Sequence, residues 1–171
     1  LCTQEIGRWF NLPVGARVDS ENKDKQARKV RAQYKQFLAG LRLRHFAPEE
    51  ILRQADRTRG RVRNSIPPEE LWENIVTTLW IADIGRRALG KPVTITSAYR
   101  SEEYNQAVGG ASRSQHKLNG ALDLVPHGAT PADLFKVFEG LREAGAFKGG
   151  LGLYSSFVHV DTRGENATWG A

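Results

Sequence analysis

The spacing of apolar residues changes near residue 90, and this change restricts the fold more than any other feature of the sequence. Before it, apolar residues recur at helical spacing, as at Leu71, Ile75, Leu79 and Ala82 in "IPPEELWENIVTTLWIADIGRRALG". After it, short segments predict strands at "PVTITSAY", "GALDLV", "GGLGLY" and "FVHVD", with a helix at "TPADLFKVFEGLREAG". Helices followed by a small, mainly antiparallel sheet predict an α+β fold.

Proline, acidic and glycine residues mark the expected helix boundaries. Pro67 and Pro68 predict the start of one long core helix, and Gly90 predicts its end. "FAPEEIL" follows the same pattern, with Pro48 at the first helical position. Thr130 is the expected N-cap of the later helix. These residues predict where three helices begin and where one of them ends.

The segment from Asp24 to Leu43 predicts a basic amphipathic helix. Its apolar residues fall at helical spacing, and its other face is rich in lysine and arginine. We expect residues 1–44 to form a basic N-terminal helical extension and residues 45–171 to form the main domain. Such a helix either docks on its own domain with a solvated basic face or binds nucleic acid or a membrane.

Length and charge limit the class of protein. A chain of 171 residues suffices for one buried core, and no apolar run approaches the ~20 residues that span a bilayer. The formal charge of +6 favours an anionic partner, such as nucleic acid, an anionic membrane surface or a bacterial cell-wall polymer. The chain contains no methionine, so we expect that a segment preceded Leu1.

Polar residues on two of the expected strands suggest a metal site. Asp123 interrupts the apolar strand "ALDLV", and His116 lies upstream across an Asn-Gly turn. In "FVHVD", His159 and Asp161 share one strand face. Cys2 is the single cysteine, so a metal would be held by histidines and carboxylates. Two imidazoles and one carboxylate with a fourth position left to water are typical of catalytic zinc; the alternative is a solvent-facing Asp123 beside an ordinary loop histidine.

Two motifs carry a resemblance to a known family. Ser114, His116, Ala121 and Asp123 resemble the S-x-H-x-x-G-x-A-x-D signature of zinc D-Ala-D-Ala carboxypeptidases. Relatives of these enzymes include L-Ala-D-Glu endopeptidases, the vancomycin-resistance dipeptidase and hedgehog domains. "GGLGLYSSFVHVDTRG" is similar to the second signature, in which a Gly-rich turn leads to a His-x-Asp strand. The resemblance runs from about Leu43 to the C-terminus and does not include residues 1 to about 40.

The chain departs from the family pattern at one position of the first motif. Asn119 stands where the family has glycine, and Gly120 follows it. Asparagine is the non-glycine residue that best tolerates a left-handed backbone, so we expect the turn to survive. The placement of Asp123 depends on that turn, since only three residues separate the two.

The resemblance implies a hedgehog/DD-peptidase-like fold, with helices packed on the sheet and a zinc cleft on the sheet. It implies Zn²⁺ as the cofactor and His116, Asp123 and His159 as its ligands. Relatives often place an acidic residue or a histidine just before the second zinc histidine. Here Ser155, Ser156 and Phe157 precede it, and none of them acts as a base.

Further site residues follow from the same resemblance. Asp161 is the nearest acidic candidate for the general base, and its rival role is to orient a zinc-bound imidazole. Arg100 would bind a substrate carboxylate or stabilise the oxyanion. Ser114 binds substrate or holds its loop. We expect Trp169 either to line the cleft or to cover the core. We expect His45 to pack at the start of a helix and His127 to lie in a loop.

The sequence therefore predicts a monomeric zinc peptidase that cuts peptide bonds in peptidoglycan stem peptides, of the carboxypeptidase or endopeptidase type. We expect no nucleic-acid partner and a periplasmic, extracellular or wall-associated location, with a phage origin as a further possibility. One alternative is a non-catalytic zinc-containing domain that binds wall or protein ligands. The other places the function in the basic N-terminal segment, as an adaptor for nucleic acid or membrane.

Overall fold

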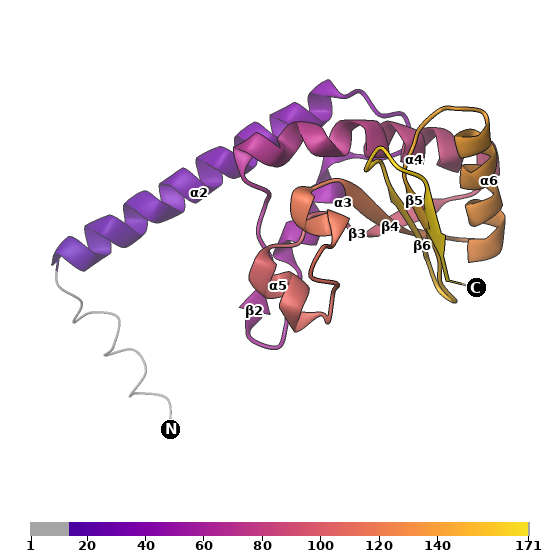
Figure 1. Cartoon of the computed structure of the whole chain (residues 1–171). Coiled ribbons are helices and arrows are strands. Elements are labelled where there is room, and N and C mark those ends of the chain that lie inside the picture. The colour runs from indigo at the N-terminus through magenta and orange to yellow at the C-terminus, as the bar shows by residue number, and fades with distance from the viewer. Residues whose placement is uncertain (1–13, 171) are drawn as a thin grey trace.

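The computed structural model describes residues 14–170, and the side chains of residues 21–170 (Figure 1). Its first half contains α2 (Val14–Gly40), α3 (Pro48–Leu52), the 3-10 helix η1 (Arg53–Asp56), a hairpin of β1 (Thr58–Arg59) and β2 (Val62–Arg63), the 3-10 helix η2 (Glu69–Ile75) and α4 (Val76–Leu89). Its second half contains β3 (Val93–Ser97), α5 (Glu102–Ala107), the 3-10 helix η3 (Gln115–Leu118), β4 (Ala121–Pro126), α6 (Pro131–Glu143), β5 (Gly150–Leu153), β6 (Val158–Asp161) and β7 (Ala167–Trp169). The predicted α+β class is confirmed.

A five-stranded sheet in the order β3-β4-β6-β5-β7 forms the centre of the domain. Its pairs are antiparallel except β5 and β7, which run parallel. α4 packs on α6, and both helices contact β4 and β6 on one side of the sheet (Figure 1). The fully buried side chains of Leu122, Leu124, Val158 and Val160 belong to the core between these layers. Because strand residues alternate in direction, the residues between them point to the other face.

α2 extends well beyond the rest of the molecule at its N-terminal end (Figure 1). Residues 21–29 are exposed, whereas Tyr34 and Leu38 are each only 2% exposed and belong to the main core. Tyr34 lies against Trp72 of η2, with ring centroids 5.1 Å apart. The last turns of α2 are therefore docked on the domain. Among the described residues, no helix is long and apolar enough to cross a membrane.

Several elements differ from the sequence-based expectation. The single helix expected from Pro67 to Gly90 is divided into η2 and α4, because residues 69–75 adopt 3-10 geometry. Gly90 does end α4 in the left-handed conformation, at φ 66°. α2 begins at Val14, earlier than the expected Asp24. The hairpin of β1 and β2 and the short strand β7 were not predicted, since strands of two or three residues carry no readable period.

Candidate metal centre and cleft

The centre of the candidate site is Asp123, in the third position of β4. β4 lies between β3 and β6, so Asp123 pairs with Ser97 on one side and His159 on the other. Its neighbours Leu122 and Leu124 point into the core, and Asp123 therefore points to the opposite face. Asp123 is only 6% exposed, so the carboxylate depends on nearby partners.

His116 reaches Asp123 from the short helix η3. The hydroxyl of Ser114 caps this helix by accepting a hydrogen bond from the His116 amide. Asn119 closes the helix in the left-handed conformation, at φ 54°, as expected for the position where the family has glycine. The ring Nδ1 of His116 lies 2.6 Å from the carbonyl oxygen of Ala98, so it carries the proton and donates. The lone pair of Nε2 then faces Asp123 Oδ1 at 3.1 Å.

His159 approaches the same oxygen from β6. Its Nδ1 lies 2.9 Å from Asp123 Oδ1, and its Nε2 lies 3.0 Å from Asp161 Oδ2. A carboxylate only accepts, so Nε2 donates to Asp161; the lone pair of Nδ1 is open to a cation in the tautomer that keeps the single ring proton on Nε2. Two ring nitrogens and a carboxylate oxygen thus converge, with one ligand atom from each residue within 4.8 Å of the others.

Charge at this cluster favours a cation. Burial lowers the pKa of His116 and outweighs the opposite effect of Asp123, which favours the neutral imidazole. Burial also lowers the pKa of His159, but its bonds to Asp123 and Asp161 raise that pKa overall. Burial raises the pKa of Asp123, yet the two histidines hold it well below its usual range. Asp123 therefore stays ionised beside the two rings, and its negative charge favours a cation where they meet.

The donor set fits zinc. Two imidazole nitrogens with one carboxylate oxygen are a common zinc ligand set. Ligating histidines almost always donate the other ring N–H to a carbonyl or a carboxylate, and His116 and His159 do so to Ala98 and Asp161. Among the described side chains, no other cluster of histidine, cysteine and acidic residues is arranged to hold a metal.

Asp161 is buried completely and its oxygens are fully used. Oδ1 accepts from the amide of Gly150 at 3.0 Å and from Nε of Arg163 at 2.8 Å, while Oδ2 accepts from His159 and from a second Arg163 nitrogen. Burial raises the pKa of Asp161, but the Arg163 guanidinium and the His159 ring hold it well below its usual range. Asp161 lines neither cavity next to the cluster. Arg163 was missed by the sequence reasoning, although it continues the alternation of His159 and Asp161.

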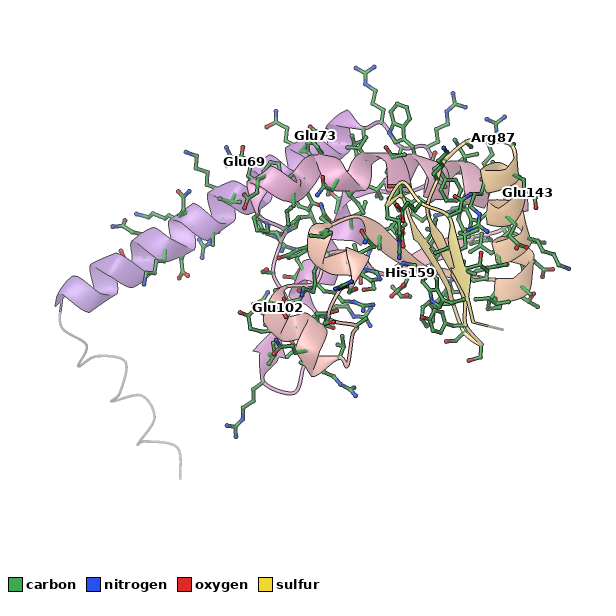
Figure 2. The ribbon with its side chains drawn as sticks, viewed as in Figure 1. Glu69, Glu73, Arg87, Glu102, Glu143 and His159 are labelled. Carbon is green, nitrogen blue, oxygen red and sulfur yellow. The ribbon has the colours of Figure 1, made fainter. Side chains whose placement is uncertain are left out.

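The cluster faces a cleft made of two adjoining cavities. The first, of about 570 Å³, is lined by His116, Asp123 and His159 together with Ser114 and other residues. The second, of about 460 Å³, begins at Asp123 and extends towards the hairpin of β1 and β2. Arg100 lines both cavities. Figure 2 shows His159 well apart from Glu102, which lies on α5 and pairs with Lys117 at 2.6 Å.

Arg100 lies directly behind the cluster. Its Nε donates to the Ser97 hydroxyl at 2.8 Å, and its terminal nitrogen donates to Asp123 Oδ2 at 2.5 Å. The guanidinium therefore holds the carboxylate oxygen that does not face the histidines. Its side chain remains 17% exposed, so it is also accessible from the cleft. Ser114, by contrast, is committed to capping η3.

Trp169 forms a wall of the first cavity. Its ring lies 5.2 Å from that of His159 between centroids, and its Nε1 donates to the Tyr154 hydroxyl at 2.9 Å. A Cβ atom at Gly152 would lie 2.6 Å from Trp169 Nε1, so this close approach requires glycine. The remaining histidines lie outside the cleft: the His45 amide bonds to Asp83, and the His127 ring bonds to Thr94.

Comparison with known proteins agrees with this geometry. Residues 44–161 match the family described as peptidase M15. The chain is also 42% identical over 52 residues to the zinc D-Ala-D-Ala carboxypeptidase of Streptomyces albus G, a match that spans 30% of this chain and 20% of that relative. With the buried His/Asp/His cluster, these matches confirm the predicted family and the predicted zinc cofactor. The chain belongs to the peptidase M15 family.

Proposed function

We propose that this chain is a zinc metallopeptidase that hydrolyses peptide bonds in peptidoglycan stem peptides. In this proposal the zinc is held by Nε2 of His116, Oδ1 of Asp123 and Nδ1 of His159. The observation that carries it is the convergence of these three atoms at the edge of a cavity. The other ring nitrogen of each histidine already donates a hydrogen bond, to Ala98 or to Asp161. We further propose that the fold is of the hedgehog/DD-peptidase type.

The chain's own residues prepare the site for hydrolysis. Bound zinc activates water and polarises a carbonyl oxygen, which is the chemistry of metallopeptidases. Ala98 and Asp161 fix the tautomer and orientation of the two imidazoles. Arg100 fixes Asp123 and presents the rest of its guanidinium to the cleft, where it suits a developing oxyanion or a substrate carboxylate.

Peptidoglycan as the substrate is supported by similarity and by charge. The matched relative bears the name of an enzyme that acts on D-Ala-D-Ala. Stem peptides contain D-amino acids and acidic groups, and the cleft is lined by Arg100, Arg113 and Arg163. The net charge of +6 favours approach to an anionic wall. We therefore propose a monomer that works on the periplasmic, extracellular or wall side of the cell envelope.

The form of the cleft supports endopeptidase rather than carboxypeptidase activity. Two cavities, with volumes of about 570 and 460 Å³, adjoin at Arg100 and Asp123. A carboxypeptidase needs room for only a terminal residue beyond the scissile bond. Two adjoining cavities suit a peptide that continues past that bond in each direction.

One observation favours a second candidate, a zinc-containing domain that binds wall peptides without cutting them. Among the described residues that line the two cavities, Asp123 is the only carboxylate. Asp123 is bonded to Arg100 and both histidines, so the cleft presents no free acidic base. A domain of this kind would bind the same peptides and release them unchanged.

Digestion of purified muropeptides with product identification by mass spectrometry separates these functions. We expect zinc-dependent cleavage at an internal stem-peptide bond. His116→Ala and His159→Ala should lose bound zinc and activity, while the matched control His127→Ala should keep both, since its ring lies outside the cleft. Release of a terminal D-alanine alone would instead establish a carboxypeptidase. Peptide binding without cleavage by the zinc-loaded chain would establish the binding domain.

A further inference from the structure

The second cavity contains two arginines, Arg57 and Arg59, whose positive charge the metal centre does not use. It is lined by the guanidinium groups of Arg57, Arg59 and Arg100, and its only carboxylate is Asp123. Asp123 already accepts from Arg100 and faces both histidines. Arg57 and Arg59 therefore have no acidic partner among the described residues that line this cavity.

Arg57 is held in place by a buried polar framework. Its NH1 donates to the carbonyl oxygen of Thr96 at 2.6 Å and to Oε1 of Gln54 at 3.3 Å. Gln54 is only 8% exposed and is fixed in turn by donating to the carbonyl of Ile95. One edge of the guanidinium is thus anchored on β3. Its Nε and NH2 make no other hydrogen bond among the described residues, so they remain open to a ligand.

Asn64 holds the same part of the cavity lining in place through three further hydrogen bonds. It is 6% exposed, and its amide donates to the carbonyl oxygens of Gln54 and Tyr99 while its oxygen accepts from the Ser101 amide. These bonds join η1 to the loop that follows β3. The hairpin that carries Arg59, paired through Arg59 and Val62, extends from this framework. The segments that carry the two arginines are therefore held in place by these hydrogen bonds.

We propose that this cavity binds a carboxylate of the substrate through Arg57 and Arg59, next to the bond that is cut. Open guanidinium edges bind carboxylates in bidentate geometry, and a concave site strengthens that attraction. Because Arg100 and Asp123 border both cavities, a peptide lying across the metal donors places its neighbouring residue here. The inference rests on the proposed peptidase function and assigns its substrate as a peptide with a free acidic group on this side.

The test compares two stem pentapeptides, one with its internal carboxylates free and one with them amidated. Binding to the full-length chain freed of metal is measured by calorimetry, and cleavage is measured with the zinc-loaded chain. The variants are Arg57→Gln and Arg59→Gln, and Arg61→Gln is the matched control because it lies in the same hairpin and lines neither cavity. Circular dichroism and zinc content check that each variant is folded and loaded.

We expect the wild-type chain and Arg61→Gln to bind the acidic peptide about 10- to 100-fold more tightly than the amidated one, the range for a charge-assisted bond. Arg57→Gln and Arg59→Gln should lose most of that preference in both binding and kcat/KM. Equal binding of the two peptides by the wild type, or an unchanged preference in both variants, overturns the proposal. If neither peptide is cleaved while the binding preference depends on these arginines, the peptidase function fails and the carboxylate site stands.

Discussion

At the scale of single residues, Asp161 shows how a buried carboxylate is stabilised. An uncompensated charge in the interior is costly, but Asp161 accepts bonds from Gly150, His159 and Arg163. A Cβ atom at Gly150 would lie 2.5 Å from Asp161 Oδ2, so glycine is needed for this approach. With all its acceptor positions used and no contact with the cleft, Asp161 is better suited to orient His159 than to move protons. We propose it as a positioning residue.

Asp161→Asn tests this assignment. The variant should bind zinc roughly 10- to 100-fold more weakly, because the orienting carboxylate of a ligating histidine is lost. Activity should largely return when zinc is added in excess. Zinc affinity is measured by competition with a chelator, and exposed Glu165→Gln, which lines neither cavity, is the control. A variant that keeps its zinc and still loses roughly 10²–10⁴-fold in rate would identify Asp161 as the general base.

The sequence could predict the cluster but not the residues that complete it. His116, Asp123 and His159 were found because polar residues on apolar strands are conspicuous and their spacing resembles a family motif. The left-handed turn at Asn119 was also correctly expected. Arg57 and Arg59 could not be found, because their place beside the cluster depends on a hairpin too short to predict. The resemblance alone left the role of Asp161 open.

At the scale of elements, η2 shows where local signals are overruled by the fold. Proline and acidic residues correctly mark a helical start after Pro68, but not its 3-10 geometry. Three bonds hold η2 to other parts of the chain: Trp72 donates to Pro67, Asn119 donates to the Leu71 carbonyl, and Asn74 donates to the Leu118 carbonyl. Two of these partners, Leu118 and Asn119, lie two and three residues after His116. η2 therefore supports the turn at Asn119, which positions His116. These contacts join distant parts of the chain, so no local sequence pattern predicts them.

The contact of α4 with α6 gives a prediction at the same scale. A Cβ atom at Gly85 would lie 2.4 Å from the fully buried ring of Phe138, so Gly85→Ala should push the two helices apart. Overpacking of this kind costs about 1–3 kcal/mol, more than the gain in helix propensity. Gly140→Ala in α6 meets nothing within 4 Å and should instead stabilise the fold by about 0.5–1 kcal/mol.

Urea unfolding of the two glycine variants and the wild type measures both changes. Opposite signs of the change in unfolding free energy are the expected result. A loss of stability in both variants would mean that the Gly85 contact with Phe138 is not what distinguishes them.

At the scale of the whole molecule, α2 raises the question of where the domain begins. The sequence places a boundary at residue 44, and that division remains a prediction. Tyr34 and Leu38, however, lie in the same core as the sheet, and Arg31 bonds to Asp56 at 2.6 Å. Burial of one such apolar side chain contributes roughly 1.5–3 kcal/mol, a large share of a typical total of 5–15 kcal/mol. We therefore propose that the folding unit starts near residue 26.

Two truncations separate these boundaries. A chain lacking residues 1–26 should fold, bind one zinc and melt close to the wild-type temperature, because residues 21–26 are exposed. A chain lacking residues 1–44 should fail to fold or melt far lower, since it loses the buried side chains of Tyr34 and Leu38 and uncovers Trp72. Calorimetric melting with and without a chelator measures both stability and zinc binding. If the shorter chain melts like the wild type and keeps its zinc, residues 45–171 are an independent domain and the last turns of α2 are an accessory to it.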